Sequence, residues 1–95
     1  MSTDRSKLPV ILAVFTGGTI SCTLDPERGV PVPTLSGEDI LERTPGLRDV
    51  ANVVVDNFGR YPGPHMHPER MLYLADRIRS ATTEGAIDGV IVTHG

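Results

Sequence analysis

A run of six consecutive apolar residues, Val10–Phe15, limits the fold of this chain more than any other feature. A strand with one face in water alternates apolar and polar side chains, whereas an unbroken apolar run indicates that both faces are buried. Burial of both faces is typical of a strand in a parallel sheet that helices cover. The run therefore predicts a parallel sheet within an α/β fold.

The segments after this run alternate between expected strands and expected helices. Residues 21–35 contain three prolines and the stretch DPERG, so they predict a loop or a short ribbon. Ser36 is a suitable N-cap, and carboxylates follow it in the first turn of a short helix that ends near Arg43. The other expected elements are a strand at 51–56, a loop at 59–67, a helix from Pro68 to Gly85 and a strand at 89–95.

This order of elements predicts an open α/β fold with a mainly parallel sheet, flanking helices and Rossmann-like layering. Within the long helix, apolar residues recur at intervals of three and four, which places them on one face. We expect this face to pack in the core rather than to hold a cofactor. Its members are Met71, Leu74, Ala75, Ile78 and Ala81.

Two glycines between two threonines, TGGT at 16–19, follow the first expected strand. Glycine at such a place marks a bend or a close approach to the backbone. Ligands of open α/β sheets bind at the carboxyl ends of the strands, where THG at 93–95 also lies. The hydroxyls of Thr16 and Thr19 and the backbone of Gly95 could therefore share one crevice. A plain tight turn fits the spacing equally well, and a phosphate loop fits worse because no G-x-G-x-x-G or GK[ST] pattern occurs.

The composition argues against several classes of function. The net charge is −3 and the Lys and Arg residues are scattered, so there is no basic patch for nucleic acid. No apolar run approaches the roughly 20 residues of a membrane span, and the N-terminus lacks a signal-peptide cleavage site. The single cysteine, Cys22, excludes an internal disulfide framework and is expected to be a small buried residue. We therefore expect a cytoplasmic protein that binds neither nucleic acid nor membranes.

The three histidines do not form a recognisable metal-binding pattern. His65 and His67 supply only two ligands, and no cysteine or carboxylate completes a known spacing with His94. Zinc sites usually need three or four protein ligands. We predict no metal and no cofactor.

Three stretches of the chain resemble one known family. FTGGTIS at 15–21, HMHPERMLYLADRI at 65–78 and DGVIVTHG at 88–95 are similar to the N-terminal part of bacterial-type L-asparaginases, the asparaginase/glutaminase family. The resemblance extends over nearly all of residues 1–95. It implies an amidohydrolase that acts on a small-molecule amide and that forms a homo-oligomer, a dimer or tetramer, at full length.

The resemblance also implies roles for individual residues. Thr19 corresponds to the nucleophile, which attacks the side-chain amide carbon and forms an acyl-enzyme ester that water hydrolyses to aspartate and ammonia. A threonine hydroxyl needs a neighbouring base for this attack, and the developing oxyanion needs N–H donors. Gly95 corresponds to a backbone contact with the substrate. Thr16 corresponds to a packing or hydrogen-bonding neighbour of the nucleophile.

This sequence departs from the family pattern at three places. The family's second motif continues from THG into Thr-Asp-Thr, so we expect residues 1–95 to be the N-terminal part of a larger domain, incomplete as a catalyst and unstable alone. The stretch GVPVPTL at 29–35 has no lid tyrosine. Gly63, Pro64 and His65 stand where many members bind the substrate's carboxylate and amine. His65 could replace one contact, and the alternatives to asparagine hydrolysis are glutamine or another amide, or a non-catalytic ligand-binding protein.

Overall fold

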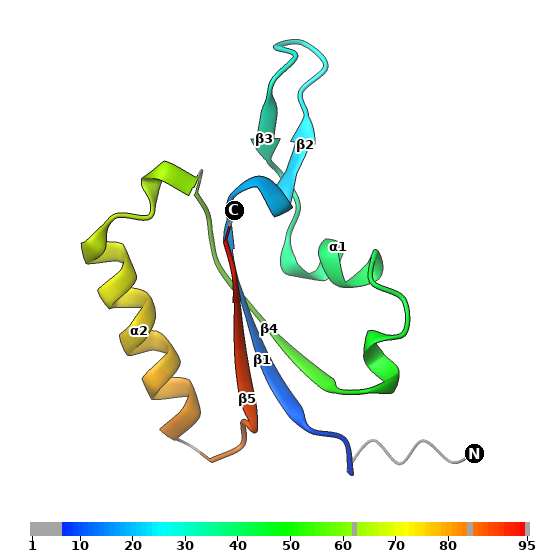
Figure 1. The fold of residues 1–95 in the computed structure, drawn as a ribbon, viewed down its shortest axis with the longest axis vertical. Coiled ribbons are helices and arrows are strands. Elements are labelled where there is room, and N and C mark those ends of the chain that lie inside the picture. The colour runs from blue at the N-terminus through cyan, green and yellow to red at the C-terminus, as the bar shows by residue number, and fades with distance from the viewer. Residues whose placement is uncertain (1–6, 62, 84, 95) are drawn as a thin grey trace.

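The computed structural model describes residues 7–61, 63–83 and 85–94, except for the side chains of Thr19 and Pro33. Three parallel strands form its main sheet, in which β1 (Val10–Gly17) lies between β4 (Asn52–Tyr61) and β5 (Gly89–Thr93) (Figure 1). The central position explains why the sequence of β1 is an unbroken apolar run. The predicted α/β fold with a parallel sheet is therefore confirmed.

Two helices cover opposite faces of this sheet, α1 (Gly37–Glu42) and α2 (Pro68–Thr83) (Figure 1). Short 3₁₀ helices lie at Thr19–Ser21, Leu47–Asp49 and Gly63–His65. The expected ribbon after β1 is an antiparallel pair, which consists of β2 (Cys22–Leu24) and β3 (Pro31–Pro33).

The main hydrophobic core lies between the sheet and α2. Leu12 and Val14 of β1 point to the same face because side chains alternate along a strand. Together with Met66 and Leu74 they form a buried cluster. Partly buried side chains surround it: Phe58, Tyr61, Ile78, Ala81, Ile87 and Val90.

The predicted apolar face of α2 is only partly correct. Leu74 is buried and Ile78 and Ala81 pack against the core, but Met71 and Ala75 are exposed. The helix touches the sheet along a stripe narrower than the sequence pattern. The sequence pattern also missed Met66, which lies before the helix and outside its periodicity.

A capping box begins α1, as the N-cap residue Ser36 led us to expect. The Asp39 N–H donates to the Ser36 hydroxyl, and the Ser36 N–H donates to the Asp39 carboxylate over 3.0 Å, which lowers the pKa of Asp39. A Cβ atom on Gly37 would overlap the Phe15 ring and lie 2.7 Å from Val55 Cγ1. The helix therefore approaches the sheet closely at this glycine.

The strand β4 is longer than predicted and corrects the expected loop at 59–67. Gly59 and Arg60 belong to the strand, which ends at Tyr61. Pairing with β1 outweighs the turn-forming tendency of these residues. The pairing is irregular, because Phe15 pairs with Asn57 whereas Gly17, two residues later, pairs with Tyr61, four residues later.

A bidentate ion pair joins the same strand to α2. Arg77 Nε donates to Asp56 Oδ2 over 2.7 Å, and Nη2 donates to Oδ1.

Over the described part of the chain, no helix is both long enough and apolar enough to cross a bilayer.

Candidate active site

The end of β1 bends sharply at two glycines. Gly17 and Gly18 have backbone φ values of 101° and 75°, which L-residues that carry a side chain rarely adopt. A Cβ atom on Gly17 would also overlap the Tyr61 nitrogen and lie 2.6 Å from the Arg60 carbonyl carbon. The Gly18 N–H donates to the Tyr61 carbonyl over 2.7 Å. Both the backbone conformation and the packing against β4 therefore require this glycine hinge.

The candidate nucleophile follows the hinge directly. Thr19 begins a single 3₁₀ turn that ends at Ser21, whose N–H donates to the Gly18 carbonyl over 3.1 Å. The Cys22 thiol donates to the same carbonyl over 3.2 Å and is half-buried. The Thr19 side chain lies outside what the structure describes, so its predicted role stays a prediction. Ser21 is buried, and its hydroxyl has no hydrogen-bond partner in the described structure.

Thr16 joins the ends of β1 and β5. Its fully buried hydroxyl donates to the Thr93 carbonyl over 2.7 Å and lies 3.2 Å from His94 Nδ1. Because a hydroxyl has one hydrogen, the second contact has Nδ1 as its donor. Thr16 therefore makes hydrogen bonds at the end of β5, while its expected role as a neighbour of the nucleophile stays a prediction. TGGT and the first two residues of THG therefore meet, while Gly95 lies outside the described residues.

A 3₁₀ turn at Gly63–His65 follows the end of β4. Its residues stand at the position where, by the family resemblance, many members contact the substrate. The His65 carbonyl accepts a hydrogen bond from Arg70 Nη1 over 2.6 Å, and its side chain is exposed. His67 Nδ1 accepts from the Arg70 backbone N–H over 3.3 Å. Among the described residues, no group of three or more possible ligands could hold a metal ion.

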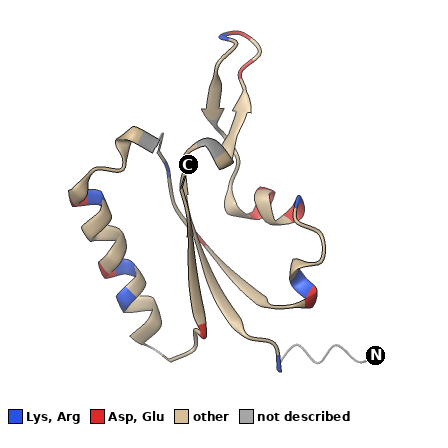
Figure 2. Ribbon diagram, in the orientation of Figure 1, with Lys and Arg blue, Asp and Glu red and all other residues tan. Residues whose placement is uncertain are grey.

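Charged residues are absent from two of the three strands whose ends meet at the candidate site. Neither β1 nor β5 contains Lys, Arg, Asp or Glu, whereas α1, α2 and the tip of the β2–β3 ribbon carry charges (Figure 2). His94 is the ionisable side chain that contacts Thr16. Activation of a hydroxyl on the hinge therefore requires a base other than the side chains of these two strands.

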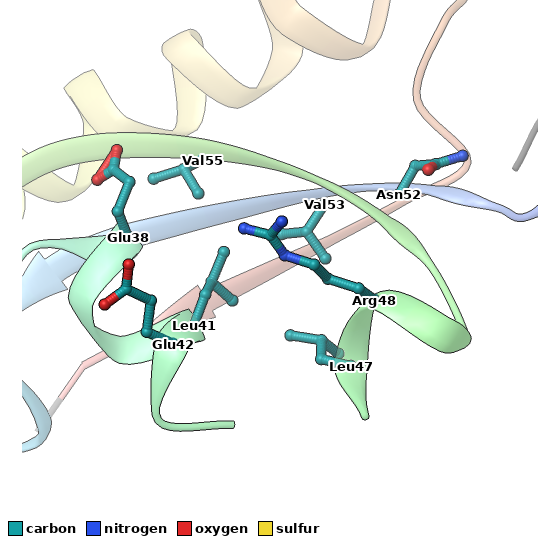
Figure 3. A pocket seen from close by; sticks show the side chains of 8 residues that line it. All are labelled: Glu38, Leu41, Glu42, Leu47, Arg48, Asn52, Val53 and Val55. Carbon is teal, nitrogen blue, oxygen red and sulfur yellow. The ribbon is translucent and has the colours of Figure 1, made fainter. Parts of the chain in front are cut away.

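A hollow lies elsewhere, between α1 and the first half of β4 (Figure 3). Its volume is about 630 Å³. Asn57, which does not line this hollow, donates to both carboxylate oxygens of Glu38, at 3.0 and 2.9 Å, and these bonds lower the pKa of Glu38. The lining residues are Glu38, Leu41, Glu42, Leu47, Arg48, Asn52, Val53 and Val55. None of them belongs to the hinge, so volume alone does not identify the candidate active site.

Comparisons with known proteins find similarity over most of this chain. The family described as "Asparaginase, N-terminal" matches residues 10–95. A solved structure, described as that of a "Probable Cytoplasmic L-asparaginase" from Campylobacter jejuni, superposes with a TM-score of 0.74 and 29% identity, covering 92% of this chain and 24% of that chain.

Several curated relatives are subunits of an enzyme with a different name, glutamyl-tRNA(Gln) amidotransferase. The protein of Methanopyrus kandleri is 31% identical over 94 residues, which covers 94% of this chain and 20% of the relative. The protein of Methanosarcina barkeri is 36% identical over 89 residues, which covers 94% of this chain and 21% of the relative. The chain thus spans about 20% of the length of these curated relatives.

Proposed function

Because this chain belongs to the asparaginase family and matches its N-terminal part, we propose that the full-length protein hydrolyses the side-chain amide of L-asparagine through an acyl-threonine on Thr19. The observation that carries this proposal is the glycine hinge immediately before Thr19, at the joined carboxyl ends of β1 and β5. Ligands of open α/β sheets bind at such ends. The solved relative from Campylobacter jejuni, described as a "Probable Cytoplasmic L-asparaginase", supports the choice of substrate.

The reaction follows from the chemistry of a hydroxyl nucleophile. A base takes the Thr19 proton as Oγ1 attacks the amide carbon, and the C–N bond breaks when that proton passes to the leaving nitrogen. Ammonia leaves, and water then hydrolyses the ester to release aspartate and the free threonine. The oxyanion formed at each step needs preorganised N–H donors. The Gly18 N–H is already bonded to Tyr61, so other amides must serve.

A second candidate function is favoured by the names of the curated relatives. An amidotransferase needs a source of amide nitrogen, and release of ammonia from glutamine or asparagine would supply it. We propose this as the alternative role: the same hinge and the same acyl-threonine, with the ammonia passed to a partner enzyme. The Gly63–His65 turn, which differs from the usual asparaginase contacts, is compatible with a changed amide substrate.

The decisive experiment compares ammonia release from asparagine and glutamine by the full-length protein and by two variants. Thr19→Ala is expected to lower kcat by about a thousand-fold or more, because it removes the nucleophile. Thr19→Ser keeps a hydroxyl and serves as the matched control, with partial activity. Mass spectrometry of a digest after reaction with a slow substrate should find the acyl group on the peptide that contains residue 19.

Other results would lead to different conclusions. Full activity of Thr19→Ala would disprove the nucleophile assignment. Calorimetric binding of aspartate or asparagine without ammonia release would indicate a ligand-binding protein instead of an enzyme. Release from glutamine alone would favour the amidotransferase-related role.

We also propose a cytoplasmic homo-oligomer, as the family resemblance implies. The solved relative from Campylobacter jejuni is described as cytoplasmic, which supports the compartment. Light scattering of the purified full-length protein would measure the number of subunits, and a monomer would contradict the proposal.

A further inference from the structure

The end of β4 determines where the glycine hinge lies. Tyr61 pairs with Gly17, and its carbonyl accepts the Gly18 N–H. Because Gly17 has no room for a side chain against this backbone, a shift of Tyr61 would move the hinge and the adjoining Thr19 with it. The position of Thr19 therefore depends on what holds Tyr61.

One side chain of α2, Arg70, holds Tyr61. The Arg70 guanidinium carbon lies 3.7 Å from the centroid of the Tyr61 ring, within the range of a cation–π contact. The Tyr61 ring also contacts Phe58, whose ring centroid lies 6.1 Å from that of Tyr61 in an edge-on arrangement. Stacking on a ring leaves the guanidinium N–H groups free to donate in the plane of the group.

The same guanidinium also holds the neighbouring turn. Arg70 Nη1 donates to the His65 carbonyl over 2.6 Å, while Arg70 itself is only partly exposed. His65 ends the turn that corresponds to the family's substrate contacts. Arg70 thus contacts the ring of Tyr61, whose backbone holds the hinge, and the backbone of the turn that corresponds to substrate recognition.

We propose that Arg70 is a positioning residue that fixes the Thr19 hinge through Tyr61 and the Gly63–His65 turn through the His65 carbonyl. The proposal rests on the proposed function for its kinetic consequence, although its structural consequence is separate. Loss of Arg70 should lower kcat, because the nucleophile is misplaced, and raise KM, because the recognition turn is released. Misplacement of about 1 Å can slow catalysis by up to about 100-fold.

Two arginines on the same helix provide matched controls. Arg77 binds Asp56 of β4 and so anchors the same helix to the same strand without touching Tyr61 or His65 in the described contacts. Arg79 makes an exposed contact with Asp76 one turn away. Each can be replaced by methionine, which keeps most of the aliphatic stem and removes the charge. Arg77→Met measures the effect of weaker helix attachment together with loss of the Arg77 contact on Phe58, whose ring centroid lies 5.7 Å from the guanidinium carbon.

The experiment uses the full-length protein with Arg70→Met, Arg70→Lys, Arg77→Met and Arg79→Met. Hydrogen exchange, followed by mass spectrometry, reports the amides of peptide 16–22, which includes the Gly18 N–H. We expect Arg70→Met to accelerate exchange in this peptide and to lower kcat/KM by about 10- to 100-fold, with both kcat and KM changed. Arg70→Lys keeps a cation over the ring and should recover kcat more than KM. The two control variants should leave kcat and KM within about twofold of the wild type.

The outcomes separate this proposal from the proposed function. If Arg70→Met matches Arg77→Met in both exchange and kinetics, Arg70 is not a positioning residue, whatever the reaction. If wild-type protein releases no ammonia from any amide while Arg70→Met still accelerates exchange in peptide 16–22, the positioning role stands and the amidohydrolase proposal fails. If Arg70→Met lowers activity without changing exchange, the path through Tyr61 is wrong.

Discussion

The two faces of the sheet are held by different kinds of interaction. On the α2 face, a 16-residue helix buries Leu74 against Leu12 and Val14. On the opposite face, the six-residue α1 leaves a hollow of about 630 Å³ beside β4. This short helix is attached at its first turn, where the Gly37 N–H donates to Asn57 Oδ1 over 2.7 Å. Apolar burial and the Arg77–Asp56 ion pair therefore attach the long helix to one face, whereas a polar contact and the close approach of Gly37 to Phe15 and Val55 attach the short helix to the other.

This difference shows how the two faces should respond to substitution. A face held by apolar burial loses stability when side-chain volume is removed. A face held by close approach loses stability when volume is added. A face held by carboxylate hydrogen bonds also responds to pH. The following predictions test these three expectations on the full-length protein.

The largest effect is expected on the α2 face, for Leu74→Ala. Removal of this buried side chain should lower the free energy of unfolding by about 2–5 kcal/mol, because it leaves a cavity. Leu72→Ala is the matched control, since Leu72 is on the same helix and 69% exposed. Its expected effect in urea denaturation is within about 0.5 kcal/mol. Equal effects of the two substitutions would show that α2 does not pack as described.

A smaller effect of opposite origin is expected on the α1 face, for Gly37→Ala. The new methyl group would meet the Phe15 ring and Val55, so the free energy of unfolding should fall by about 1–3 kcal/mol. Phe15→Leu in the same protein should recover part of this loss, as a double-mutant cycle would measure. Helix propensity alone predicts that alanine stabilises this position. A stabilised Gly37→Ala protein would therefore contradict the close approach of α1.

The smallest effect concerns the pH dependence of α1. Asn57 lowers the pKa of Glu38 in the folded state, so the associated stability is present above the pKa of the unfolded state and is lost as the pH falls through the lower, folded value. Glu38→Gln should therefore lose less stability than the wild type when denaturation is repeated between about pH 6 and pH 3.

A second substitution tests the cause of this pH effect. Asn57→Ala removes the main donor and should reduce the pH dependence by less than Glu38→Gln does, because the Glu38 backbone N–H and the Ser36 side chain also lower the pKa of Glu38. The double variant should show no further reduction beyond that of Glu38→Gln. Additive reductions would mean that another group is responsible for the lowered pKa.

Local patterns in the sequence were sufficient to predict most of the fold. The unbroken apolar run of β1, the N-cap at Ser36 and Pro68 at the start of α2 each depend on neighbouring residues, and each prediction is confirmed. The strand at 59–61 was missed because turn-forming residues there are held by pairing with Gly17, a contact distant in sequence. Met71 was misplaced because periodicity gives the direction of a helical face but not its width.

The location of the candidate site could be predicted from the sequence, but the side-chain contacts that hold it could not. Glycines after a strand indicated the hinge, and its location beside the end of β5 follows from the strand order. The link from Thr16 to Thr93 and the stack of Arg70 on Tyr61 could not be predicted. Both depend on side chains brought together by the sheet pairing and by the packing of α2, which no local pattern specifies. The catalytic role of Thr19 and the contact of Gly95 stay predictions.

The uneven pairing near the hinge has a consequence for how this region can be altered. Between Phe15 and Gly17 β1 advances two positions, while its partner advances four, from Asn57 to Tyr61. Tyr61 therefore reaches the hinge only if the number of residues between it and Asn57 is kept. An insertion or deletion in that interval would shift the pairing register of β4 with β1 and bring a different carbonyl group opposite Gly18. Substitution of the exposed Arg60 would leave the pairing unchanged. The number of residues in this interval therefore constrains the sequence more strongly than the identity of residue 60 does.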